Sequence, residues 1–157
     1  KTAVLLAGSL KIGAILAGAT AEDAENLYNF GMHIGVAFQL QDDLLDVYGD
    51  PEGFGKKIGG DILCNKKTYM LIKALEHADE KQQEELNRWL NAETFQPAEK
   101  IKAVTEIYNQ LNIRNVCENK MREYYTLAME SLAAVAVAED RKKELKNLVK
   151  LLMYREM

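Results

Sequence analysis

Apolar side chains recur every three or four residues along most of this 157-residue chain, which is the spacing that gives a helix one apolar face. The pattern is clear in residues 27–45, 101–108, 116–132 and 145–152. No segment alternates apolar and polar residues for more than a few positions, as a half-buried strand would. Because only two prolines interrupt the pattern, the sequence predicts an all-α fold whose helices pack as a bundle.

Capping and terminating residues predict where individual helices begin and end. Thr20 is a suitable N-cap, and acidic residues follow it in the first turn. The helix is expected to run from about 21 to 48, because Gly49 and Pro51 come directly afterwards. The other expected helices cover 68–78, 79–90 with a capping box of Asp79 and Gln82, a segment with Pro97 in its first turn, 113–137, and the residues from 140 onwards.

Composition limits the classes of function. The formal net charge is -4 and the pI is near 5.3, which argues against nucleic acid as a general partner. No low-complexity segment or linker divides the chain, so we expect a single all-α domain over residues 1–157. Cys64 and Cys117 are too few and too far apart for a disulfide framework or a metal site. Free, buried thiols in a reducing cytoplasm are the expectation.

Residues 1–19 are mostly apolar, yet they do not read as a membrane span. Lys11 lies in the middle, where a membrane helix would lose about 2.5–3.5 kcal/mol on the insertion scale. The sequence favours a helix that is buried on nearly all sides, with Gly8, Gly13 and Gly18 allowing neighbouring helices to approach closely. The chain also begins in mid-pattern without an initiator methionine, so we expect further sequence upstream.

Three aspartates crowd the C-terminal end of the expected helix 21–48. Asp46 lies four residues after Asp42 and three after Asp43, and Gln39 lies three before Asp42 and four before Asp43, so all four crowd one helix face. Acids near a helix C-terminus cost about 0.3–1 kcal/mol each at exposed sites. A divalent cation would reverse this penalty, since it prefers hard oxygen ligands. The alternative is an acidic, solvated helix end without a ligand.

A glycine-rich stretch with several lysines follows the aspartates. Residues 49–65 contain five glycines together with Lys56 and Lys57, and Lys66 and Lys67 follow directly after this range. Carboxylates that face ammonium groups suit a metal-bridged phosphate, because Mg2+ usually binds through one or two carboxylates and substrate phosphates. A plain connector is the alternative, although long loops in compact domains are usually functional.

These residues resemble a known family. The ordered series is Phe38-Gln39, then DDLLD, Gly49-Asp50, Gly55-Lys56, Gly60-Asp61 and Lys66-Lys67-Thr68, with Lys1-Thr2-Ala3 upstream. A bare DDxxD is common in acidic helices, but the whole series over about thirty residues resembles the second aspartate-rich region of the trans-isoprenyl diphosphate synthases. The resemblance implies a helical bundle of the isoprenoid synthase type, present here as its C-terminal helices only.

The resemblance also implies a chemistry. In this family an allylic diphosphate ionises, and the double bond of isopentenyl diphosphate attacks the carbocation. Mg2+ ions held by two aspartate-rich regions bind the departing diphosphate, which stabilises charge that develops on the leaving group. The implied partners are thus allylic and isopentenyl diphosphates, the implied cofactor is Mg2+, and a cytoplasmic homo-oligomer is expected.

Roles follow for individual residues, again by resemblance. Asp42 should be the direct metal ligand, whereas Asp43 and Asp46 should act mainly through a metal-bound water or by supporting the ligands without touching the metal. Asp61 should orient a lysine or a metal-bound water. The expected catalytic residues are Lys1, Thr2, Gln39 and Asp42; the expected substrate-binding residues are Lys1, Gln39, Lys56 and Lys66.

One departure from the family pattern is large. The first aspartate-rich region, the arginines after it and the usual isopentenyl diphosphate pocket are absent from these residues. We therefore expect the C-terminal portion of a synthase, inactive on its own and prone to self-association through uncovered apolar faces. A non-catalytic subunit that binds a partner synthase is the alternative, and a plain helical interaction module is a third.

Overall fold

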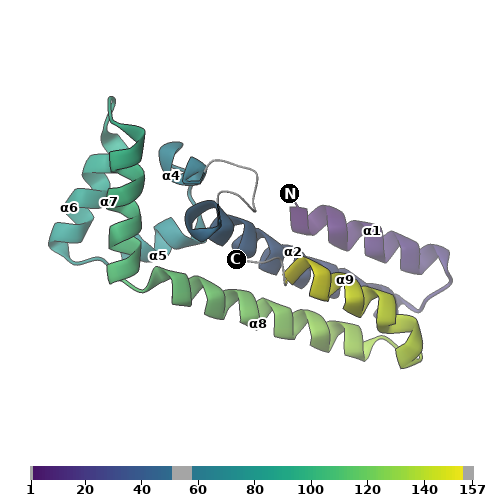
Figure 1. Cartoon of the computed structure of the whole chain (residues 1–157). Helices are drawn as coiled ribbons and strands as arrows, with labels where there is room; N and C mark the ends of the chain where they lie inside the picture. Colours follow the sequence, from purple (N-terminus) through teal and green to yellow (C-terminus); the bar gives the residue numbers. More distant parts are fainter. Residues whose placement is uncertain (1, 51–57, 154–157) are drawn as a thin grey trace. The chain divides into compact units, whose positions relative to one another are not determined.

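The computed structural model describes residues 2–50 and 58–153. All regular structure within these ranges is helical, which confirms the predicted all-α fold (Figure 1). Three lysines named in the sequence analysis, Lys1, Lys56 and Lys57, lie outside the described residues. The helices are α1 (Thr2–Leu16), α2 (Ala21–Tyr48), α4 (Gly60–Leu63), α5 (Tyr69–His77), α6 (Glu80–Asn91), α7 (Pro97–Gln110), α8 (Ile113–Ala134), the 3-10 turn η1 (Glu139–Lys142) and α9 (Lys143–Met153).

The chain forms two compact units. The first combines the residues up to Gln41 with those from Lys120 onwards, and the second is Asp42–Asn119. Each of α2 and α8 contributes residues to both units. The expectation of a single domain over residues 1–157 stays a prediction.

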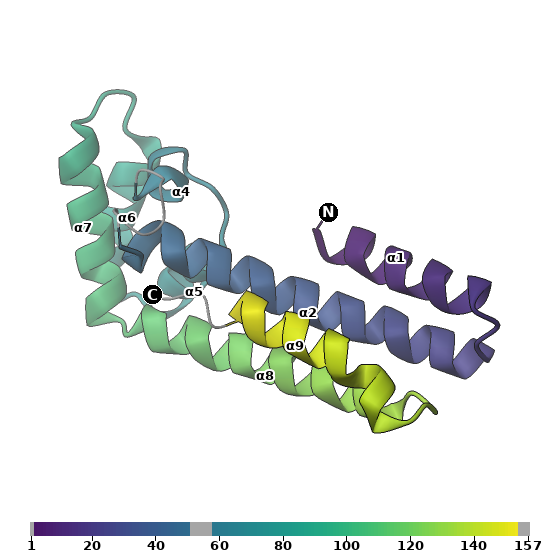
Figure 2. The same cartoon turned by 45° about the vertical axis from the view of Figure 1, so that its right-hand side comes forward.

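In the first unit, α1, α8 and α9 run alongside α2 (Figures 1 and 2). The apolar stripe of α2 supplies the centre of this core, in which Phe30 and Ile34 are 2% exposed. Leu132 of α8 and Val149 of α9 are buried against them. The predicted stripe at 27–45 therefore does face a core.

Close packing of α1 on α2 occurs at glycines other than those expected. A side chain at Gly31 or Gly35 would meet the backbone of Ala7 or Ala3, at 2.6 and 2.5 Å from their Cα atoms. Nothing lies within 4 Å of the corresponding positions at Gly8, Gly13 and Gly18, so the expectation for these three was wrong. The glycines that permit the approach belong to the partner helix.

The expectation that the first helix is buried on nearly all sides was also wrong. Only Ala7 and Ala14 of α1 are buried. The opposite side is apolar and exposed, because α2 covers one face only; it comprises Val4, Leu5, Ile12, Ile15 and Leu16. No helix in the described parts of the chain is long and apolar enough to cross a membrane.

In the second unit, α4, α5 and α6 pack on α7. The N-cap of α5 is Thr68, which the sequence analysis placed inside the helix; its hydroxyl accepts a hydrogen bond from the Leu71 amide at 3.2 Å. Asp79 and Gln82 form the expected capping box at the start of α6, and Pro97 opens α7. The structure differs from the sequence in three details. Residues 49–65 include the short helix α4, and α8 ends at Ala134 and not at 137. The thiol of Cys64 is exposed, whereas that of Cys117 is buried as expected, and neither cysteine forms a disulfide.

Candidate active site

The candidate site lies in the second unit, where the last two turns of α2 carry the three aspartates. Asp43 is 5% exposed, while Asp42 and Asp46 are partly exposed. The helix ends at Tyr48, as the sequence predicts. Because the negative end of the helix dipole lies here, each carboxylate needs a favourable partner, and those of Asp43 and Asp46 differ.

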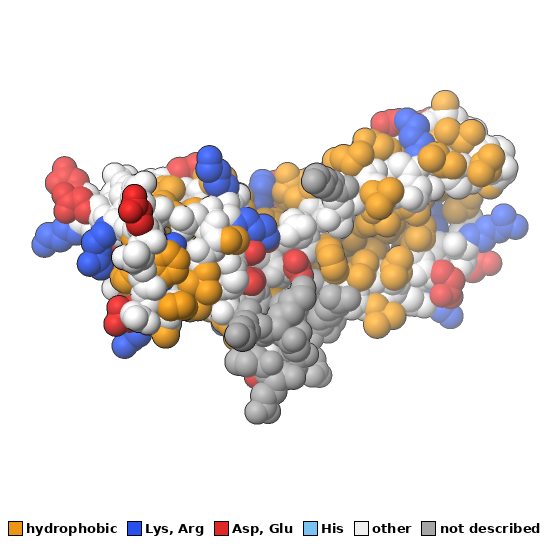
Figure 3. All heavy atoms as spheres, turned by 90° about the horizontal axis from the view of Figure 1, so that it is seen from above, with side chains coloured by type: hydrophobic (Ala, Val, Ile, Leu, Met, Phe, Trp, Pro, Cys, Tyr) orange, Lys and Arg blue, Asp and Glu red, His pale blue; other side chains and the backbone are white. Residues whose placement is uncertain are grey.

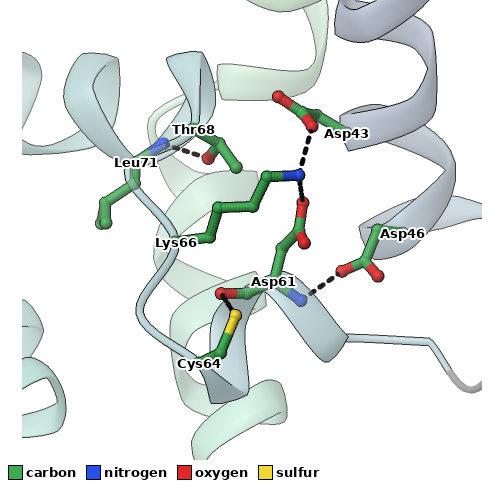
Figure 4. A network of polar contacts seen from close by, with 7 residues as sticks. All are labelled: Asp43, Asp46, Asp61, Cys64, Lys66, Thr68 and Leu71. Atoms are coloured by element: carbon green, nitrogen blue, oxygen red, sulfur yellow. Dashed lines mark hydrogen bonds and ion pairs between the residues drawn. The ribbon is translucent and has the colours of Figure 1, made fainter. Parts of the chain in front are cut away.

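Asp43 holds Lys66. The ammonium of Lys66 lies 2.9 Å from a carboxylate oxygen of Asp43 and 2.6 Å from one of Asp61. Figure 4 shows this ammonium pointing between the two carboxylates, which come from α2 and α4. Burial alone would lower the pKa of Lys66, but its hydrogen bonds to Asp61 and Asp43 outweigh that effect and raise the pKa above its usual value. Lys66 is therefore charged at every physiological pH, and the expectation that Asp61 orients a lysine is confirmed.

Asp46 holds the start of α4. Its carboxylate accepts a hydrogen bond from the Asp61 amide at 2.9 Å (Figure 4), and its carbonyl oxygen accepts one from the Gly59 amide. Gly59 has a φ of 84°, a left-handed conformation that costs other residues about 1–2 kcal/mol. Burial raises the pKa of Asp46, and the hydrogen bond from the Asp61 amide opposes part of the rise. These contacts place Asp61 where it can reach Lys66.

Asp42 differs from its two neighbours. In residues 2–50 and 58–153, no hydrogen bond or ion pair engages its carboxylate. The described part of the chain contains no group of three histidine, cysteine or acidic side chains that could hold a metal ion between them. A single free carboxylate still fits Mg2+, which usually takes one or two carboxylates and completes its octahedron with water and substrate phosphate.

The remaining predicted residues belong elsewhere. Thr2 is exposed on α1, and Gln39 is half-buried on α2, both in the first unit. Thr2 borders an open, largely apolar hollow of about 540 Å³ whose other walls are Leu5, Leu6, Ser9, Gly35, Phe38 and Leu152. The roles of Thr2 and Gln39 stay predictions, as do those of Lys1 and Lys56.

Sequence reasoning missed two polar residues beside Lys66. The ammonium of Lys100, on α7, donates a hydrogen bond to the Asn65 side-chain oxygen at 2.6 Å. Lys100 is 1% exposed. The signal was present in the sequence, because Lys100 occupies the first position of an apolar stripe that continues at Val104 and Ile107, where a lysine is unexpected.

Comparison with known proteins decides the family. The family described as Polyprenyl synthetase matches residues 1–110. The chain belongs to the polyprenyl synthetase family.

Individual relatives agree. A (2E,6E)-farnesyl diphosphate synthase of Mycobacterium bovis is 33% identical over 99% of this chain and 44% of its own length. A crystal structure of a geranylgeranyl pyrophosphate synthase superposes with a TM-score of 0.89 at 35% identity, covering 100% of this chain and 49% of that one. Another, the enzyme of Corynebacterium glutamicum complexed with isoprenyl diphosphate and magnesium, has a TM-score of 0.79 at 30% identity, covering 92% and 41%.

These similarities establish the isoprenoid synthase fold for the chain. They also show its extent: the chain spans less than half the length of each of these relatives.

Proposed function

We propose that this chain provides the diphosphate-binding side of a Mg2+-dependent prenyltransferase, which extends an allylic diphosphate with isopentenyl diphosphate. The observation that carries the proposal is that the aspartates at the end of α2 have different surroundings. Asp43 and Asp61 fix the Lys66 ammonium, while the Asp42 carboxylate on the same helix face has no partner among the residues that the structure describes. A fixed cation next to a free carboxylate is the arrangement that a metal-bridged diphosphate needs.

Each described residue then has a defined task. Asp42 would ligate Mg2+ directly, and Lys66 would donate its remaining N–H to the diphosphate. Asp43 and Asp46 do not need to touch the metal, because they hold Lys66 and the start of α4. When bound, Mg2+ would neutralise the charge that collects on the diphosphate as it leaves.

The rest of the substrate would use residues outside this cluster. Gln39, Lys1 and Lys56 keep the predicted contacts with the reaction centre and the diphosphate. In the reaction, the bond between the allylic carbon and the diphosphate oxygen breaks. The isopentenyl double bond then forms the new carbon–carbon bond, and loss of a proton restores a double bond. We also propose that the chain acts as part of a homo-oligomer in the cytoplasm.

Binding of inorganic pyrophosphate tests the metal and lysine roles without requiring turnover. Calorimetry should detect binding by this chain in the presence of Mg2+ and not in the presence of EDTA. Asp42→Asn should weaken binding by about 10–100-fold, the range seen when a group supporting a metal site is lost. Glu80→Gln, at an exposed acid in the first turn of α6 and outside the motif series, is the control. Equal binding by the wild type and Asp42→Asn would refute the role of Asp42.

Turnover tests the reaction itself. The chain is incubated with Mg2+, isopentenyl diphosphate and an allylic diphosphate, alone and with the N-terminal half of a relative, and prenyl products are extracted. Product only in the mixture supports the proposal. Silence in both favours the alternative, a non-catalytic subunit that binds a synthase, for which the exposed apolar side of α1 is the supporting observation.

A further inference from the structure

The buried ammonium of Lys100 has no explanation in packing. Within the described ranges no carboxylate pairs with it; its contacts are the Asn65 oxygen at 2.6 Å and the ring of Phe95, whose centroid is 4.2 Å away. Burial lowers the pKa of Lys100. An ammonium that is removed from water without a carboxylate beside it is unfavourable, whereas leucine or methionine would fill the same position of the α7 stripe without that penalty.

The partner of Lys100 is Asn65, which has an uncommon backbone conformation. Asn65 has a φ of 52°, a left-handed conformation that asparagine tolerates better than most residues. Its side chain is held at both ends, since its oxygen accepts from Lys100 and its amide donates to the Leu90 carbonyl at 2.9 Å. Two elements, α6 and α7, therefore fix one residue of the segment between α4 and α5.

The residue after this fixed point is Lys66. Its backbone amide donates to the Asp61 carbonyl at 3.0 Å, and its ammonium reaches Asp43 and Asp61. Figure 4 shows how the side chain leaves the connecting segment and extends across to α2. The direction in which Lys66 leaves the backbone depends on the turn at Asn65, so a clamp on Asn65 is also a clamp on Lys66.

We propose that Lys100 is a positioning residue, which acts through Asn65 to hold Lys66 where it meets the diphosphate. This role rests on the proposed function of Lys66 and adds a residue on α7 that touches neither metal nor substrate. The unfavourable burial of Lys100 is then offset by a firmly held loop. An ammonium to amide-oxygen hydrogen bond in a dry environment is stronger than a neutral one.

Three variants test the connection. Lys100→Met keeps the length and packing of the side chain and removes the charge. Asn65→Gly keeps the left-handed turn without strain and removes the amide. The third variant combines both changes. Lys102→Met, at an exposed lysine of the same helix, is the matched control. Each chain is measured for thermal stability, for Mg2+-dependent binding of inorganic pyrophosphate, and for the 15N-correlated NMR signal of the Lys66 ammonium.

Positioning predicts that binding and stability separate. Lys100→Met should unfold at the wild-type temperature or above, since replacing buried charge by apolar groups is often neutral or stabilising. It should nevertheless bind pyrophosphate about tenfold more weakly, and the Lys66 ammonium signal should shift or broaden. Asn65→Gly should give the same loss, and the double variant should lose no more than either single variant, since the two residues act in series.

Other outcomes overturn the proposal. A variant Lys100→Met with an unchanged Lys66 signal would show that Lys100 is structural only, as would additive losses in the double variant. If the wild type itself does not bind pyrophosphate, the proposed function of Lys66 fails. The NMR signal then still decides whether Lys100 positions it.

Discussion

At the end of α2, a lysine from another segment stabilises a carboxylate that the dipole of its own helix disfavours. Asp43 is almost fully buried at the negative end of the helix. Lys66 supplies the opposing charge to both Asp43 and Asp61, so the pair of acids is stable only while the lysine is present. The local structure and the proposed diphosphate binding depend on the same ammonium, and substitutions of Lys66 should affect both.

Lys66→Met should lower the free energy of unfolding by about 1–2 kcal/mol, because it leaves two acids close together without their shared cation. We expect less than the 3–5 kcal/mol typical of a fully buried pair, since the Lys66 side chain is 42% exposed and water screens it. Urea titration at pH 7 measures the change. Lys67→Met, at the exposed neighbouring lysine, is the control and should change stability little. Equal effects in the two variants would contradict the role of the ion pairs.

The two cysteines should differ in reactivity. Burial raises the pKa of the Cys117 thiol to about 12, so very little of the reactive thiolate exists at pH 8. Cys64 is exposed. Iodoacetamide at pH 8 should therefore modify Cys64 within minutes and Cys117 only after unfolding in urea. Peptide mass spectrometry over time distinguishes them, and modification of both at one rate in the native chain would contradict the burial of Cys117.

At the level of elements, the contact between α1 and α2 depends on which helix carries the glycine. Gly35 of α2 faces the backbone of Ala3, whereas Gly8 of α1 faces open space. Only at the former is the absence of a side chain needed for the helices to meet.

Gly35→Ala and Gly8→Ala should therefore have opposite effects. The new methyl group at Gly35 would lie 2.5 Å from the Ala3 Cα, so α1 must shift, at a cost of about 1–3 kcal/mol. The same change at Gly8 meets nothing within 4 Å and should stabilise the helix by about 0.5–1 kcal/mol. Chemical denaturation of both variants measures the difference. Destabilisation of similar size in both would contradict the assigned contact.

The same glycines show what the sequence can and cannot predict. Local signals such as Thr20, Gly49 and the Asp79–Gln82 box act within one helix turn, so the bounds of α2 and the start of α6 were predictable. Partner choice between helices is not a local property, and the glycines of α1 were wrongly given the close contact.

The same limit applies at the candidate site. Spacing placed Asp42, Asp43 and Asp46 on one helix face, but it could not say which of them would remain free. That depended on Lys66, which lies 20 residues or more further along the chain and reaches Asp43 across space. Lys100 was missed because its partner Asn65 is 35 positions away.

For the whole molecule, the exposed side of α1 is the most consequential surface. Leu5 and Leu16 are 74% and 83% exposed, and three further apolar residues of the helix accompany them. Figure 3 shows hydrophobic side chains gathered on this face, over the helices of the first unit. Contiguous apolar surface of this kind marks an interface or an aggregation site.

We therefore expect the isolated chain to self-associate, and the association to depend on this side of α1. Replacing Leu5 and Leu16 together by glutamine should weaken self-association by tenfold or more, since burying one leucine contributes about 1.5–3 kcal/mol and about 1.4 kcal/mol is a factor of ten. Folding stability should change little, because both side chains are already in water. Sedimentation velocity across a range of concentrations measures the effect, with Ile72→Gln, at an exposed apolar residue of α5, as the control. A wild-type chain that stays a compact monomer at high concentration and unfolds in one sharp transition would show that this surface tolerates water, and the case for a partner on α1 would fall with it.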